Sequence, residues 1–389
     1  MEGAITLNSK PVKGNILAID TGSTSSKFAY YKDGALLCEG KVDHSKEEIA
    51  KAPYFADQLP MRHDAALKFL IENHVPCEDV DVIMARGGLF TPVITGIYDV
   101  NADMREVLMS GRDGKHVCNL SAVMAEDLAA EVNEAREAKG YKGPFGPCRA
   151  YVADPPMADE MLPECRLGGI PEFPRETLFH ALNSRAIVRR YLADTGHSVN
   201  DITAIVCHMG GGVTISLHRN GRVIDTSHGL GGDGPITPER AGCCPPLKLV
   251  DMCFSGKYTE QEIRHKLVGG GGAVAYFGTN DMRVIEEKAK AGVPEYKVFM
   301  DAFCLNISKY IAAETADVCG KVDALLFTGG VAYSKYVTGE IIKRIGHLFP
   351  DIRIYPGEDE LRSLAENGYI VLSGTAKIHT YNKDRLIED

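Results

Sequence analysis

The sequence has no excess of positive charge, and this absence removes one large class of functions. Its 389 residues include 43 lysines and arginines against 53 aspartates and glutamates, a formal net charge of −10. Proteins that hold nucleic-acid backbones need dense lysine and arginine, so we expect no nucleic-acid partner. A local cluster of a few cations would still suffice to bind one small anion through close contacts.

Two further absences concern cysteine spacing and long apolar runs. The 11 cysteines are scattered, and their spacings match neither a disulfide framework nor a zinc motif. This pattern is typical of reduced thiols in the cytosol. The first 15 residues lack the apolar core of a signal peptide, and no run approaches membrane-spanning length. We therefore expect a cytoplasmic protein with no membrane partner.

The sequence does contain a repeated pattern of strands and glycine turns. Near the N-terminus an apolar strand, the turn TGSTSS, a second strand, the turn KDG and a third strand follow one another. The same order returns in AIVCHMGGGVTISLHRNGRVIDTSHG, with a triple-glycine turn and an Asn-Gly hairpin. Gly22 and Gly210 lie 188 residues apart, and Gly34 and Gly221 lie 187 apart. This register indicates two duplicated domains of mixed α/β type.

Helical stretches separate these strand units. We expect one helix over 175–196, with Pro174 at its start, and another over 295–320, where apolar residues recur at three and four. A third glycine turn, Gly329-Gly330, follows an apolar strand and precedes a helix. That arrangement is typical of a turn that contacts a nucleotide.

The first turn has the composition of a phosphate-binding loop. Asp20 is followed by a glycine, by four consecutive hydroxyl residues and then by Lys27. Backbone N–H groups and the hydroxyls of Ser23 and Ser25 can donate to phosphate oxygens, and Lys27 adds a positive charge. Because Asp20 would repel phosphate, its presence predicts an intervening Mg²⁺. The P-loop spacing is absent, and a strand rather than a helix follows.

Other candidate residues are weaker when each is taken alone. Arg86 ends an apolar strand before two glycines, which favours anion binding over an ordinary surface arginine. Asp154 comes just past a strand, a good place for a metal ligand. His180 lies in the expected helix, where a histidine is more often structural. The motif GLGGDG at 229–234 matches a dinucleotide fingerprint, but prolines follow where a helix should open, so we interpret it as a substrate loop.

Taken together, these segments resemble the acetokinase family, and the forms ARGGL, HMGGG and YPGEDE are similar to the butyrate kinases within it. The resemblance runs from about Asn15 over nearly the whole chain, through segments such as AIDTGSTSSK, FHALNSRAIVRRY, GPITPERAG and FTGGVAYSK. It implies two ribonuclease H-like domains of the acetate and sugar kinase/Hsp70/actin superfamily, with ATP in a cleft between them. The implied domains are 1–156, rejoined by a C-terminal helix at 364–389, and 157–363.

The resemblance also implies a reaction and its partners. The expected reaction is reversible, Mg²⁺-dependent phosphoryl transfer from ATP to the carboxylate of butyrate or a similar short-chain fatty acid. Its products would be butyryl phosphate and ADP, and a homodimer formed through the second domain is implied in the same way. The preferred acid and the physiological direction stay open.

Site residues follow from the same resemblance, position by position. The catalytic residues that it implies are Arg86, Asp154, His180 and Arg240. The residues that it assigns to ATP and its phosphates are Asp20, Ser23, Ser25, Lys27, His208, Gly210, Gly211, Gly212, Asp281, Arg283, Gly329 and Gly330. The metal ligands that it implies are Asp154 and an acid of YPGEDE, best matched by Asp359, with Glu358 and Glu360 not separated from it.

Asp20 keeps alternatives open, because the family usually has asparagine there while sugar kinases prefer aspartate. A sugar or polyol kinase would need an aspartate as base for a neutral hydroxyl. A non-enzymatic actin-like or Hsp70-like ATP switch would leave Arg86, Arg240 and His180 idle. A carboxylate acceptor is already ionised at neutral pH and needs no base, so positioning and charge neutralisation would supply the catalysis.

Overall fold

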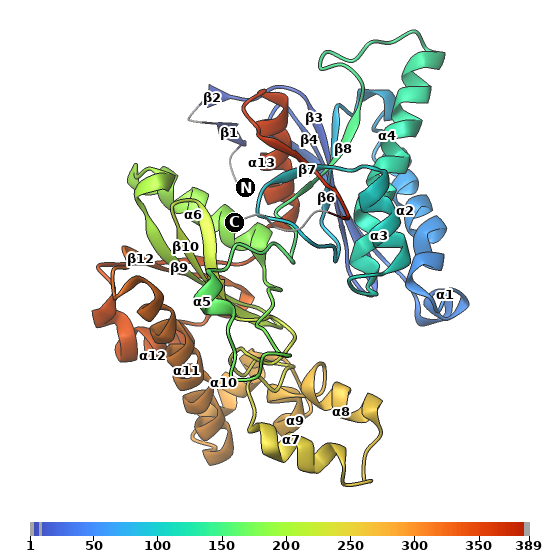
Figure 1. Cartoon of the computed structure of the whole chain (residues 1–389). Helices are drawn as coiled ribbons and strands as arrows, with labels where there is room; N and C mark the ends of the chain where they lie inside the picture. Colours follow the sequence, from blue (N-terminus) through green and yellow to red (C-terminus); the bar gives the residue numbers. More distant parts are fainter. Residues whose placement is uncertain (1–3, 8–9, 385–389) are drawn as a thin grey trace. The chain divides into compact units, whose positions relative to one another are not determined.

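The computed structural model describes residues 4–7 and 10–384, which form two compact units. Unit 1 contains the described residues up to Ala158 and from Asp359 onward, and unit 2 is Asp159–Glu358. Each unit has its own β-sheet with helices packed on it (Figure 1). No helix in the described ranges is long and apolar enough to cross a membrane. All 11 cysteines are free thiols, as their spacing predicts.

Unit 1 is built on a seven-stranded sheet in the order β14-β7-β8-β6-β3-β4-β5. Its strands are β3 (Asn15–Thr21), β4 (Ser25–Lys32), β5 (Ala35–Asp43), β6 (Val82–Arg86), β7 (Ile97–Asp99), β8 (Arg149–Ala153) and β14 (Ile378–Thr380). The predicted opening of three antiparallel strands is confirmed in β3, β4 and β5. Strands β6 and β8 lie parallel to β3, so their carboxyl ends share one edge of the sheet.

Helices cover both faces of this sheet, because β3 is apolar on both faces. The helices of unit 1 are α1 (Lys46–Lys51), α2 (Leu59–Glu72), α3 (Ala102–Ser110), α4 (Leu120–Ala138) and α13 (Glu360–Leu372). Leu17 and Ile19 pack in one core cluster with buried residues of α2 and α4. On the opposite face α13 lies so close that a Cβ on Gly368 would come within 2.9 Å of Ile16 and 3.0 Å of Met84.

The C-terminal helix is therefore part of unit 1, but it is shorter than the sequence predicts. It runs over Glu360–Leu372 rather than 364–389, and Gly374 follows it with φ of 71°, a left-handed conformation that ends helices. Strand β14 then pairs with β7 at the edge of the sheet. Residues 385–389 of the predicted helix lie outside the described residues.

Unit 2 repeats the plan with a five-stranded sheet in the order β11-β10-β9-β12-β13. Its strands are β9 (Thr203–Met209), β10 (Val213–Arg219), β11 (Arg222–Thr226), β12 (Ala324–Gly329) and β13 (Asp351–Pro356). The antiparallel trio β9, β10 and β11 confirms the second copy of the repeated pattern. Strand β12 lies parallel to both β9 and β13.

The helices of unit 2 are α5 (Pro163–Arg166), α6 (Ala181–Thr195), α7 (Pro246–Cys253), α8 (Glu260–Leu267), α9 (Gly272–Phe277), α10 (Met282–Lys290), α11 (Pro294–Glu314) and α12 (Lys335–Ile345). Helix α11 confirms the helix predicted from residue 295 onward. The helix predicted over 175–196 ends as expected at Gly196, but it begins only at Ala181. The residues before it are not helical, because the Arg175 side chain reaches across to the Thr226 carbonyl and the Asp225 carboxylate at the end of β11.

Candidate active site

Three predicted site residues of unit 1 lie at one edge of its sheet. Asp20 is the penultimate residue of β3, Arg86 is the last residue of β6, and Asp154 directly follows β8. The strand register places Arg86 opposite Ala153. Ligands of open α/β sheets bind outside the carboxyl ends of parallel strands, which is where these side chains start.

The charged groups at this edge are paired with one another. Arg86 Nη1 lies 3.3 Å from Asp20 Oδ1 and 3.2 Å from Glu360 Oε1, and Lys27 Nζ lies 3.6 Å from Asp20 Oδ2. Burial alone would raise the pKa of Asp20. The charges of Arg86 and Lys27, together with a hydrogen bond to Glu360, outweigh burial and lower this pKa. Burial alone would lower the pKa of Arg86, but Glu360 and Asp20 raise it. The charge of Asp20 is thus compensated by side-chain cations, which removes the reason for expecting Mg²⁺ at that carboxylate.

Arg62 organises the first turn, and sequence reasoning missed it. Its side chain is fully buried, and its guanidinium donates to the carbonyls of Gly22 (3.0 Å), Ser23 (3.1 Å) and Ser25 (3.2 Å). With these carbonyls directed at a cation, the turn presents less negative charge to a phosphate. The signal was available, since Arg62 lies three, four, seven and eight residues before other buried positions of α2, on the apolar face of that helix.

The two predicted hydroxyls of this turn differ in access. Ser23 is exposed, and its Oγ lies 3.3 Å from His116 Nε2. Ser25 is buried at the start of β4. The Ser23 hydroxyl is therefore the one of the pair that solvent, and hence a ligand, can reach.

Asp154 is tied to the loop that follows β6. Its backbone is left-handed, with φ of 44°, and its N–H donates to the Gly96 carbonyl at 2.7 Å. In return Asp154 Oδ1 accepts from the Gly96 N–H at 2.9 Å. These two hydrogen bonds hold a buried carboxylate at the same edge of the sheet as Arg86.

Unit 2 places its glycine turns at the equivalent edge. The triple glycine 210–212 follows β9, Gly330 follows β12, and Glu358 comes shortly after β13. Gly329 has φ of 87°, and a Cβ there would lie 2.4 Å from the Met209 carbonyl oxygen. Only glycine permits this close approach of β12 to the end of β9.

Arg240 packs directly on the triple-glycine turn. A Cβ on Gly212 would lie 1.8 Å from Arg240 Nη1, so the contact depends on glycine. Thr237 connects the two segments, because its Oγ1 accepts from the Arg240 N–H at 2.9 Å and donates to the Gly211 carbonyl at 3.0 Å. The guanidinium itself donates to the Gly229 carbonyl.

The charge of Arg240 is not compensated by an ion pair with any carboxylate among the residues that the structure describes. Its Nε is buried without a hydrogen-bond partner there. Burial lowers the pKa of Arg240, although a guanidinium stays charged at every physiological pH. A half-buried cation with a buried, unsatisfied Nε favours the binding of an anion.

Two histidines stack beside the triple glycine. The rings of His180 and His208 have centroids 3.7 Å apart and an interplanar angle of 13°. Nδ1 of His180 lies 2.8 Å from Thr214 Oγ1, and Nδ1 of His208 lies 2.9 Å from Asn183 Oδ1. His180 precedes α6 as its N-cap residue, so the expectation that it lies inside a helix is wrong.

The three consecutive acids of YPGEDE point to different partners. Glu358 Oε1 lies 3.4 Å from His208 Nε2, and a Cβ on Gly210 would come within 2.8 Å of it. Asp359 caps α13, with Oδ1 accepting from the Arg362 N–H at 2.8 Å. Glu360 is the partner of Arg86 described above.

Asp281 and Arg283 are paired with each other at the start of α10. Arg283 Nη2 lies 2.7 Å from Asp281 Oδ2, and hydrogen bonds from Arg283 lower the pKa of Asp281 to about 2. Glu286 of the same helix accepts from Ser334 Oγ at 2.5 Å, and Ser334 caps α12 just after the third glycine turn. The pair therefore lies on a helix that is bonded to the Gly329-Gly330 segment.

The comparisons with known proteins identify the family of this chain. A model of the acetokinase family matches residues 175–355. Butyrate kinase 2 of Clostridium acetobutylicum is 39% identical over 370 residues, which cover 95% of this chain and 100% of that protein. A probable butyrate kinase of Phocaeicola vulgatus is 38% identical, with 95% and 99% covered. The chain belongs to the acetokinase family.

Solved structures confirm the fold predicted for this chain. The acetate kinase of Entamoeba histolytica aligns with a TM-score of 0.71 at 18% identity, covering 91% of this chain and 98% of that one. A propionate kinase of Francisella tularensis aligns with a TM-score of 0.68 at 18% identity, covering 91% and 98%. Both the resemblance seen in the sequence and the two-sheet fold class are thus confirmed.

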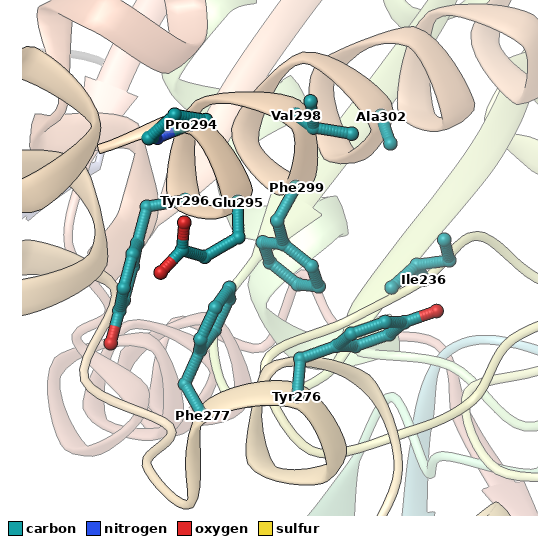
Figure 2. Close-up of a pocket in the computed structure, with 9 residues that line it drawn as sticks. All are labelled: Ile236, Tyr276, Phe277, Pro294, Glu295, Tyr296, Val298, Phe299 and Ala302. Atoms are coloured by element: carbon teal, nitrogen blue, oxygen red, sulfur yellow. The ribbon is translucent and has the colours of Figure 1, made fainter. Parts of the chain in front are cut away.

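Unit 2 also has an open cavity of about 870 Å³, and its lining contains none of the predicted site residues described above. Figure 2 shows its lining of Ile236, Tyr276, Phe277, Pro294, Glu295, Tyr296, Val298, Phe299 and Ala302. Phe277 stacks on Tyr296 with ring centroids 4.1 Å apart. None of the predicted site residues lines this cavity, and its one charged lining side chain is an acid, so it is unsuited to phosphate.

Proposed function

We propose that this chain transfers the γ-phosphoryl group of ATP, reversibly, to the carboxylate of butyrate or a similar short-chain fatty acid. The relatives named butyrate kinase match almost the whole chain, and together they support this acceptor. The structural observation that carries the proposal is Arg240, a half-buried side chain on a glycine turn, whose Nε is buried and which has no carboxylate ion pair among the described residues. Such a group is built to receive an anion from outside the chain.

The chemistry requires charge compensation rather than proton removal. A carboxylate oxygen of the acid attacks the γ-phosphorus, and the bond from that phosphorus to the oxygen bridging it to ADP breaks. The acid is already ionised at neutral pH, so no base is needed. The obstacle is repulsion between two anions, which Arg86 and Arg240 would reduce, while His180 donates to an oxygen of the transferring group.

The glycine turns would hold the nucleotide. Backbone N–H groups of turns at the carboxyl ends of strands suit phosphate oxygens. We assign the phosphates to Ser23, Lys27, His208, the triple glycine 210–212 and Gly329-Gly330, with Asp20 holding Lys27 and Arg86 in place. Ser25 is buried, so its hydroxyl is not among the groups that we expect to contact a phosphate. We assign the adenosine to Asp281 and Arg283, which lie beside the third turn.

The cofactors of this proposal are ATP or ADP with Mg²⁺. Carboxylate oxygens are the ligands that Mg²⁺ prefers, and Asp154 with the acids 358–360 can supply them. Each of the three acids already has a partner, His208 for Glu358, the first turn of α13 for Asp359 and Arg86 for Glu360, so we keep all three as candidates. When bound, the ion would neutralise phosphate charge. We also retain the predictions of a homodimer formed through unit 2 and of a cytoplasmic location.

The sugar kinase alternative gains no support from Asp20. A base for a neutral hydroxyl needs a carboxylate that can accept a proton near neutral pH. The neighbouring Arg86 and Lys27 lower the pKa of Asp20, which makes it a poorer base than an ordinary aspartate.

The test is to incubate the protein with MgATP, hydroxylamine and a panel of acids and sugars. Acyl hydroxamate formed from short fatty acids would establish the acceptor class. Each methylene contributes about 1 kcal/mol to recognition in an apolar pocket, so propionate, isobutyrate and valerate should react less well than butyrate but measurably. ADP release with a sugar, or ATP hydrolysis without hydroxamate, would refute the proposal.

A further inference from the structure

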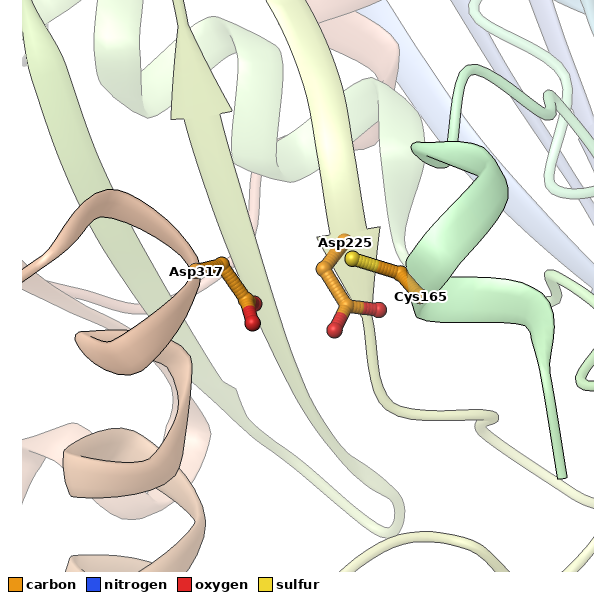
Figure 3. Close-up of side chains that lie close together, drawn as sticks. All are labelled: Cys165, Asp225 and Asp317. Carbon is orange, nitrogen blue, oxygen red and sulfur yellow. The ribbon is translucent and has the colours of Figure 1, made fainter. Parts of the chain in front are cut away.

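Unit 2 holds a second group of metal-ligating side chains that the proposed reaction does not use. Cys165 belongs to α5, Asp225 to β11, and Asp317 to the 3₁₀ turn Ala316–Val318 that follows α11 (Figure 3). Each residue offers one ligand atom, and these three atoms, the cysteine sulfur and one oxygen from each aspartate, all lie within 4.8 Å of one another. Three elements far apart in the sequence therefore bring suitable donors to one place.

A third acid, beside this cluster, has an unsatisfied oxygen. Glu314 ends α11 and is only 6% exposed, and Asp225 and Asp317 are its foremost charged neighbours. Its Oε2 is buried and accepts no hydrogen bond within the described ranges, and the same holds for Asp317 Oδ2. Buried carboxylate oxygens without a donor are rare because each loses its hydration.

One protein cation faces the cluster, and it is already shared. Arg175 Nη1 donates to Asp225 Oδ2 at 3.0 Å, while its Nε donates to Asp233 Oδ2 at 2.9 Å. Its charge also lowers the pKa of Glu314 and of Asp317, but burial and the neighbouring acids outweigh it and raise both. Without a further cation, burial raises the pKa of Asp317 to about 6 and that of the Cys165 thiol to about 12.

We propose that Cys165, Asp225 and Asp317, with Glu314 as a further carboxylate, bind one divalent transition-metal ion of the Zn²⁺ type. A sulfur ligand disfavours Mg²⁺ and Ca²⁺, which prefer oxygen alone, whereas zinc accepts thiolate and carboxylate together. Zinc bonds of about 2.0–2.3 Å in a tetrahedron place ligand atoms about 3.3–3.8 Å apart, so small side-chain rotations would close the site. Binding releases the thiol proton and any carboxyl proton to solvent, with no change of oxidation state.

The ion would join three segments of unit 2 that no disulfide bond connects. Helix α5 lies on the stretch that enters the unit, β11 is an edge strand of its sheet, and Asp317 lies at the end of its longest described helix. Because the unfolded chain lacks this arrangement, binding should stabilise the folded state. This site is separate from the Mg²⁺ of the proposed reaction.

The experiment titrates chelator-treated full-length protein with Zn²⁺ by calorimetry, and with Co²⁺ by absorbance. We expect one ion per chain at micromolar affinity or tighter, and a thiolate-to-cobalt charge-transfer band. Cys165→Ser and Asp317→Asn should each weaken binding at least about 100-fold. The matched control is Cys253→Ser, which removes an exposed thiol elsewhere in the unit and should leave binding unchanged.

Thermal unfolding distinguishes a lost site from a lost fold. Without metal, Asp317→Asn should melt at or above the temperature of the unaltered chain, because it removes a buried negative charge. With Zn²⁺, the unaltered chain should gain stability and the variant should not. Absence of stoichiometric binding, undiminished binding in Cys165→Ser, or equal binding of Mg²⁺ would each overturn the proposal and leave a cluster neutralised by protons.

Discussion

The two units place cations at equivalent edges of their sheets but treat the charges differently. In unit 1, Arg86 and Lys27 are paired with Asp20 and Glu360. In unit 2, Arg240 lies against a glycine turn, and no carboxylate of the described chain pairs with it. In the proposed reaction a phosphate would compete with two carboxylates for Arg86, whereas Arg240 would bind it without such competition. The two units thus share the positions of their turns, while the side chains that surround the cations differ between them.

The largest effect is expected from Arg240→Ala. Because this cation is otherwise uncompensated, its removal should lower turnover by about 10³-fold or more in the hydroxamate assay. Unfolding stability should fall less than in Arg86→Ala, since the partner left behind is the Gly229 carbonyl rather than a carboxylate. Arg240→Lys, which keeps the charge but loses the planar fork, should retain part of the activity. Near-normal turnover in Arg240→Ala would remove this residue from the mechanism.

Arg86→Ala should also cost several orders of magnitude in turnover, but with a second consequence. It removes the arginine partner of Asp20 and Glu360 and leaves Lys27 as the cation beside Asp20, so the free energy of unfolding should fall by about 2–4 kcal/mol in urea titrations. Adding Asp20→Asn to this variant should recover part of the stability and none of the turnover. Equal stability losses for the alanine variants of Arg86 and Arg240 would contradict the contrast drawn between the units.

Arg62→Met should have an intermediate effect. Loss of the guanidinium frees the carbonyls of the first turn, so we expect the KM for ATP to rise about 10-fold with a smaller change in kcat. Arg136 offers a matched control, because it is another buried arginine of unit 1, bonded to Asp81 and to backbone carbonyls away from the turn. Arg136→Met should reduce stability but leave the KM for ATP unchanged. A rise of similar size in both variants would mean that Arg62 acts only through stability.

The smallest effect concerns pH. The folded pKa of Asp20 is lowered below its ordinary value of 3.8, so its stabilising contribution is present above that value and is lost as pH falls through the folded pKa. Stability measured by urea unfolding should therefore decline less steeply below pH 4 in Asp20→Asn than in the unaltered chain. Parallel acid profiles for the two proteins would show that the ion pairs of Asp20 do not contribute.

Much of the fold and part of the candidate site can be predicted from local patterns. Apolar runs broken by glycine, Asp-Gly and Asn-Gly identify the strands and turns, because strand alternation and positive φ depend on near neighbours. Asp20, Arg86 and Asp154 were placed correctly at strand ends for the same reason. The start of α6 at Ala181 was not, because Arg175 is held by residues some 50 positions away.

The remaining features depend on contacts between distant parts of the chain. Arg86 meets Glu360 across 274 residues, so no spacing rule reveals this pair. Helical spacing places Arg62 on the apolar face of α2, but it does not show that the side chain reaches the first turn about 40 residues earlier. Cys165, Asp225 and Asp317 come together only because α5, β11 and the end of α11 pack side by side. Backbone conformation depends mainly on adjacent residues, so the sequence alone predicts it. Ion pairs and metal ligands depend on tertiary packing, because packing brings distant charged side chains together and removes the water that would otherwise solvate them.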